Sequence, residues 1–122
     1  MSTEFTIGEH TYRAGRLDAR TQFHVVRRLG PVLADLTTAS TGNVIANIAV
    51  AVGKLKDEDA DYVIDKSLRV VTRAQDNGRG WAAVSNPTGG LMFDDIDMPV
   101  MLQLVWKVLE EYLVPFFKGS LS

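Results

Sequence analysis

The chain has no cysteine among its 122 residues, and its two histidines, His10 and His24, stand far apart. The missing thiols exclude disulfides, thiolate catalysis and Cys-ligated metals, and they suit a reducing cytoplasm. No H-x-x-x-H or H-E-x-x-H spacing occurs, so we expect no histidine-rich metal site. Nucleophile motifs of the G-x-S-x-G type and phosphate-binding glycine loops are also missing. We therefore expect no enzyme and no cofactor, and a small metal-independent hydrolase is the least favoured function.

The chain also has no large excess of positive or negative charge. The formal net charge is −2 and the pI is about 5.6, whereas a general nucleic-acid binder normally has a basic excess. Long apolar runs are absent too. The longest stretch without charge, residues 36–53, is interrupted by Thr, Ser and Asn, and its apolar part is shorter than the roughly 20 residues needed to cross a bilayer. Residues 1–10 show no basic or apolar region typical of a signal peptide. We expect no nucleic-acid partner and no membrane partner.

Asp57, Asp59 and Asp61 have the spacing with which a calcium loop begins. That loop needs Gly at its sixth position and Glu at its twelfth, but Tyr62 and Leu68 stand there. Capping of a helix by Asp57 or Asp59 is the better interpretation. A second acidic group is interpreted as a turn and N-cap before the last helix rather than a cation site; it consists of Asp94, Asp95 and Asp97.

The periodicities predict one mostly α domain over residues 1–122, a small four-helix domain with two short β-hairpins. The first hairpin turns at Gly8-Glu9, where Gly at the first central position suits a type II′ turn. The predicted elements in chain order are a hairpin over 1–14, a helical body over 18–117 with helices at 18–37, 43–54, 58–75 and from 98 to 116 or 117, a hairpin over 81–93 within that body, and a flexible tail over 118–122.

The helix over 18–37 is predicted to begin at Asp18, a good N-cap. Gly30-Pro31 should kink or briefly break it. Its expected buried face consists of Phe23, Val26, Leu29, Val32, Leu33 and Leu36. A basic group near its start consists of Arg13, Arg16, Arg20, Arg27 and Arg28. This group is either a docking patch for an acidic partner or a solvated face that pairs with the acidic start of the helix over 58–75.

The last helix carries apolar residues over an unusually wide arc, with two neighbouring faces. Such an arc either exposes one face to a partner or belongs to a central helix that buries both faces. The candidate partner-binding residues are Leu102, Trp106, Leu109, Leu113, Phe116, Arg27 and Arg28.

The run YRAGRLDARTQFHVVRRLGPVLA, residues 12–34, resembles the opening of a family of tail assembly chaperones from long-tailed bacteriophages. The resemblance covers roughly residues 10–115. Its further matches are Asp61-Tyr62-Val63-Ile64, Leu68-Arg69-Val70-Val71, Gly80-Trp81 with Val84, and Leu91-Met92-Phe93-Asp94-Asp95-Ile96.

The resemblance implies a small helical, non-enzymatic protein of the host bacterial cytoplasm. Such a protein binds the tape-measure protein until tail-tube subunits replace it, and it is not expected in the mature virion. In many such families a ribosomal frameshift near the stop codon makes a longer form that contacts the tail-tube protein; here the codons of residues 115–117 could carry the slippery run. A homo-oligomer is compatible with this function. The alternative is a structural tail-completion or connector subunit.

Overall fold

The computed structural model describes residues 3–32, 44–75, 80–86, 88 and 90–121; for residues 44 and 112–121 we describe the backbone alone. The elements in chain order are β1 (Thr3–Ile7), β2 (His10–Ala14), α1 (Ala19–Leu29), the 3-10 turn η1 (Gly30–Val32), α3 (Val44–Gly53), α4 (Asp57–Leu68), β3 (Val71–Ala74), β4 (Trp81–Ala83) and α5 (Met98–Leu121).

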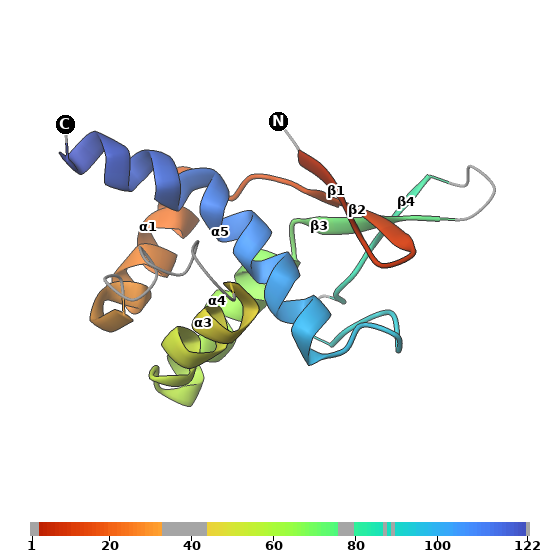
Figure 1. Cartoon of the computed structure of the whole chain (residues 1–122), viewed down its shortest axis with the longest axis horizontal. Helices are drawn as coiled ribbons and strands as arrows, with labels where there is room; N and C mark the ends of the chain where they lie inside the picture. The colour runs from red at the N-terminus through yellow and green to blue at the C-terminus, as the bar shows by residue number, and fades with distance from the viewer. Residues whose placement is uncertain (1–2, 33–43, 76–79, 87, 89, 122) are drawn as a thin grey trace.

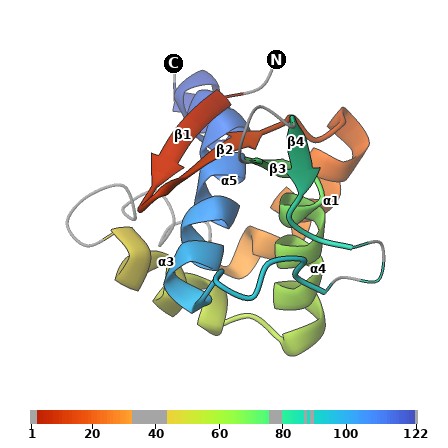
Figure 2. The ribbon, with the colours of Figure 1, turned by 90° about the vertical axis from the view of Figure 1, so that its right-hand side faces the viewer.

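The four strands form one antiparallel sheet in the order β1-β2-β3-β4. The helices gather to one side of the sheet, and α5 runs diagonally between the sheet and the other helices (Figure 1). Seen from the sheet side, α3 and α4 lie below the strands, while α5 rises to their height (Figure 2). The fold is therefore mixed α/β, and the predicted mostly α class with two separate hairpins is wrong.

The first hairpin is confirmed. Ile7 pairs with His10 across the two-residue turn, and Gly8 has a φ of +61°. A positive φ at this position is what the predicted turn requires, and glycine adopts it without steric cost. The turn thereby fixes the register of all five β1–β2 pairs.

The fold class was missed because of residues 69–74. The helix predicted over 58–75 ends at Leu68, and the chain continues as β3. Val70, Val71 and Thr72 are β-branched residues, which favour strands. β3 pairs with the free side of β2 through Arg13↔Thr72 and Ala14↔Val71. This long-range pairing supplies backbone hydrogen bonds that a helix would otherwise make.

The second predicted hairpin, over 81–93, is also wrong. β4 pairs with β3 instead. The segment that was predicted to pair with it makes only an isolated bridge, between Ser85 and Leu91. The backbone N–H of Met92 donates to the carbonyl of Val84 at 2.8 Å. The returning segment therefore pairs with residues just after β4 and forms no strand.

At the N-terminus of α1 the predicted cap is confirmed, since the Asp18 carboxylate accepts from the Thr21 backbone N–H at 2.7 Å. The break at Gly30-Pro31 takes the form of η1; the continuation over 33–37 lies outside the described residues. The buried face consists of Val25, Leu29 and Val32, whereas Phe23, which we predicted to be buried, is exposed.

α5 begins as predicted, because Asp97 accepts from the Val100 N–H at 3.1 Å. It contacts α3, α4 and β2, and its residues form a large part of the core. It runs through Pro115 to Leu121, so the helix includes most of the segment that we predicted to be a flexible tail.

Gly15 links the hairpin to the end of α4. Its N–H donates to the Val70 carbonyl at 2.7 Å, and a Cβ added at Gly15 would lie 3.1 Å from that same oxygen. We expect Gly15→Ala to lower the free energy of unfolding by about 1–3 kcal/mol, the usual cost of overpacking. Gly30→Ala is the matched control, because Gly30 has a helical φ of −42° and nothing lies within 4 Å of its added Cβ. Urea denaturation should show equal or higher stability for the control. Equal losses at the two sites would contradict the close approach.

Candidate partner-binding surfaces

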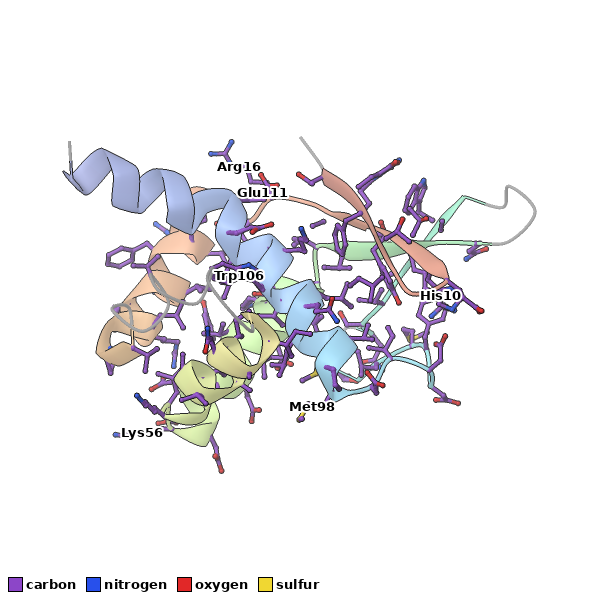
Figure 3. The ribbon with its side chains drawn as sticks, viewed as in Figure 1. His10, Arg16, Lys56, Met98, Trp106 and Glu111 are labelled. Atoms are coloured by element: carbon purple, nitrogen blue, oxygen red, sulfur yellow. The ribbon has the colours of Figure 1, made fainter. Side chains whose placement is uncertain are left out.

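Three of the predicted partner-binding residues of α5 are core residues in this structure. Leu102 is 6% exposed, Trp106 is 7% exposed and Leu109 is buried completely. Trp106 lies on the central part of α5 (Figure 3). Leu113 and Phe116 lie outside the residues whose side chains are described. The burial favours the alternative that the sequence left open, a central α5, while a role of these residues in partner binding stays a prediction.

Arg28 pairs with the acidic start of α4. Its Nη1 donates to Asp59 Oδ1 at 2.6 Å, and its guanidinium lies 4.2 Å from the centre of the Tyr62 ring. This contact fixes the packing of α1 on α4. The predicted capping by Asp57 or Asp59 is wrong, since Lys56 occupies the N-cap without a side-chain hydrogen bond and Asp59 binds Arg28 instead.

Arg27 is exposed, whereas the neighbouring Arg28 is partly buried. It lines an open cleft of about 300 Å³ together with Arg28, Pro31 and Asp59. Among the residues whose side chains the structure describes, no carboxylate forms a salt bridge with Arg27. Of the two predicted basic residues, Arg27 is thus the one left accessible to an acidic partner.

Phe23 is the candidate that the sequence reasoning missed. It is 62% exposed on α1. With Arg20 and Arg27, which are also exposed, it forms a stripe at three- and four-residue spacing along one helix face. We call these three residues the α1 stripe. The signal that could have found it is the second apolar series Val25, Leu29 and Val32, which fits the helical period equally well and turns Phe23 away from the core.

Other exposed apolar side chains are distributed over several elements. They occur on α3, in the segment before α5 and at the first residue of α5, where Figure 3 shows Met98. These residues are Val50, Leu91, Met92 and Met98.

A polar cluster joins the tip of the sheet to the segment before α5. Asp95 accepts from Arg73 Nη1 at 2.7 Å and pairs with His10 Nε2 at 2.9 Å. The hydrogen bond from Arg73 lowers the pKa of the Asp95 carboxyl. Burial raises the pKa of the neighbouring Tyr12 hydroxyl. The second predicted acidic group thus serves as a structural anchor at Asp95 and as an N-cap at Asp97.

The raised pKa of Tyr12 predicts a loss of stability at alkaline pH. The folded state favours the neutral phenol, so its contribution is complete below the ordinary tyrosine pKa, about 10. That contribution is lost as the pH rises through the higher pKa of the folded state. Urea denaturation from about pH 8 to about pH 11 should show a steeper decline for the wild type than for Tyr12→Phe, which cannot ionise there. Parallel declines would show that burial of Tyr12 does not govern its ionisation.

The described part of the chain contains no group of three or more His, Cys, Asp or Glu side chains that could hold a metal ion. No helix in these residues is long and apolar enough to cross a membrane.

Comparison with known families decides the class of the protein. A family model described as phage tail assembly chaperone protein, TAC, matches residues 8–122. The chain belongs to this family. The resemblance seen in residues 12–34 and in the shorter motifs after them is therefore confirmed. No curated protein and no solved structure matches the chain.

A chaperone binds its partners through surfaces that they can reach. The α1 stripe is exposed, whereas Leu102, Trp106 and Leu109 of α5 are buried. The open cleft beside Arg27 extends that surface towards Pro31.

Proposed function

We propose that this tail assembly chaperone binds the tape-measure protein in the host cytoplasm and assists polymerisation of the tail tube. The family match over residues 8–122 is the observation that carries the proposal. The role is non-enzymatic: the protein holds its partner, and tail-tube subunits replace it as the tube grows. It does not remain in the mature virion. A longer, frameshifted form would supply the contact with the tail-tube protein.

The α1 stripe is our proposed first contact. Phe23 offers an apolar side chain, and the two arginines that flank it offer positive charge. A partner helix with an apolar face bordered by Asp or Glu would complement this pattern. The tape-measure protein is long and helical, so it can present many such segments.

Co-expression with the tape-measure protein of the same phage tests the proposal. The tagged chaperone should co-purify with it, and the yield should fall as salt rises from about 0.1 M to about 1 M, because salt screens the arginines. An unrelated long coiled-coil protein serves as the control partner. Equal capture of both proteins would contradict specific recognition.

Mass spectrometry of purified virions separates this function from that of a structural subunit. The chaperone should be absent from mature particles and present in lysates of infected cells. Its presence in fixed stoichiometry with tail proteins would favour the tail-completion or connector alternative.

A further inference from the structure

The two edge strands of the sheet differ in length and in protection. β4 is three residues long, and a very short edge strand is a common protection against pairing with another chain. β1 is five residues long and has an unbroken register with β2. Its sequence, TEFTI, contains no proline and no lysine. In the described residues no strand pairs with β1 on its outer side.

The register identifies the free backbone groups of β1. In a two-residue hairpin the residues flanking the turn, Ile7 and His10, exchange both backbone hydrogen bonds, and bonded pairs then alternate with non-bonded ones. Phe5 and Thr3 accordingly bond inward to β2. The N–H and C=O groups of Glu4 and Thr6 point outward, so the edge offers two donors and two acceptors.

We propose that β1 pairs antiparallel with β1 of a second copy of this chain, about a two-fold axis at Phe5, and that the two sheets become one of eight strands. Glu4 of each copy then lies opposite Thr6 of the other, and these pairs exchange four backbone hydrogen bonds. Phe5 lies opposite Phe5 as a non-hydrogen-bonded pair, in which side chains approach most closely.

Charge and packing both suit this self-pairing. No like charges stand opposite each other, since Glu4 faces Thr6, and Glu4 is already paired with Arg13 of its own chain at 3.1 Å. Phe5 is half-buried and stacks on Tyr12 with ring centres 5.9 Å apart. A second Phe5 opposite it would remove further apolar surface from water.

α5 lies close to β1 as well as to β2. It contacts β2, Thr3 of β1 donates a hydrogen bond to Glu111, and Lys107 lies 5.6 Å from the Phe5 ring. The charge of Lys107 is balanced by Glu110 at 3.3 Å.

Thr6→Pro tests the edge without breaking the hairpin, because the lost N–H points outward and proline is tolerated there. Thr6→Ala keeps that N–H and is the matched control. Sedimentation equilibrium up to about 1 mM should show reversible dimers for the wild type and the control, and at least about tenfold weaker association for Thr6→Pro. Near-identical far-UV spectra would show that the hairpin is intact.

A cross-link provides the second test, since the chain has no cysteine of its own. Phe5→Cys should form a disulfide with its copy under mild oxidation, because a non-hydrogen-bonded pair brings the Cα atoms to about 4.5 Å. Thr6→Cys should react far more slowly, because residue 6 lies diagonal to its copy at about 7–8 Å.

Two results would overturn the proposal. The first is that the wild type and Thr6→Pro dimerise equally well and that Phe5→Cys cross-links no faster than Thr6→Cys. This would show that the copies associate through another surface. The second is that the wild type remains monomeric at about 1 mM and that Thr6→Pro no longer captures the tape-measure protein. The edge would then bind an extended segment of that partner and not a second copy. If Thr6→Pro no longer dimerises but still captures the tape-measure protein, the result supports self-pairing and does not contradict the proposed function.

Discussion

Replacing Trp106 with alanine should lower the free energy of unfolding by about 3–5 kcal/mol, the range measured for large aromatic side chains in protein cores. Trp106 is 7% exposed and belongs to the continuous core cluster. Its removal leaves a cavity that the surrounding helices can close only in part. A chain of 122 residues has a total stability of about 5–15 kcal/mol, so the variant should lose a large part of its stability and unfold at a clearly lower temperature.

Thermal and urea denaturation followed by circular dichroism measure this effect. Met98→Ala is the control on the same helix, because Met98 is 64% exposed and its truncation should change stability by less than about 0.5 kcal/mol. Capture of the tape-measure protein should fall for Trp106→Ala in proportion to the unfolded fraction. A variant that unfolds like the wild type but no longer captures the partner would instead place Trp106 in the partner-binding face that the sequence suggested.

The sequence predicts local features of this fold better than it predicts the sheet. The Asp18 cap, the turn at Gly8 and the start of α5 after Asp97 each depend on a few adjacent residues, and each is confirmed. These features are short-range, because a carboxylate caps the turn beside it and a glycine permits the φ of its own position.

The missed strand shows the opposite case. Val70 and Val71 fit the helical period that runs from Val63, and they also fit a β-branched strand. The choice depends on β2, which lies much earlier in the chain and offers Arg13 and Ala14 as partners. Periodicity within one segment contains no information about such a distant edge.

The candidate sites follow the same logic. The wide apolar arc of α5 was correctly recognised, but the arc cannot tell whether its second face meets a partner or the helices α3 and α4. On α1 two apolar series compete, and the packing of Arg28 on Asp59 and Tyr62 accompanies the outward position of Phe23. Exposure depends on tertiary contacts, so the α1 stripe became visible only in the folded chain.

Replacing Phe23 with serine should weaken capture of the tape-measure protein by about 30-fold or more while leaving stability nearly unchanged. An aromatic side chain at the centre of an interface often contributes about 2 kcal/mol or more to binding, which corresponds to this loss. Since Phe23 is 62% exposed in the free chain, its removal opens no cavity, and the midpoint of thermal unfolding should move by no more than a few degrees.

Val50→Ser is the matched control for this change. Val50 is 60% exposed, lies on α3 and is also apolar, so it reports the effect of losing an exposed apolar side chain away from the α1 stripe. Titration of the purified tape-measure protein against each variant, by calorimetry or biolayer interferometry, gives the two dissociation constants. Arg27→Glu should add a further loss that shrinks at high salt, because it reverses the charge beside Phe23. If Phe23→Ser and Val50→Ser bind the partner equally well, the first contact lies elsewhere on the chaperone, and the α1 stripe is a solvated face.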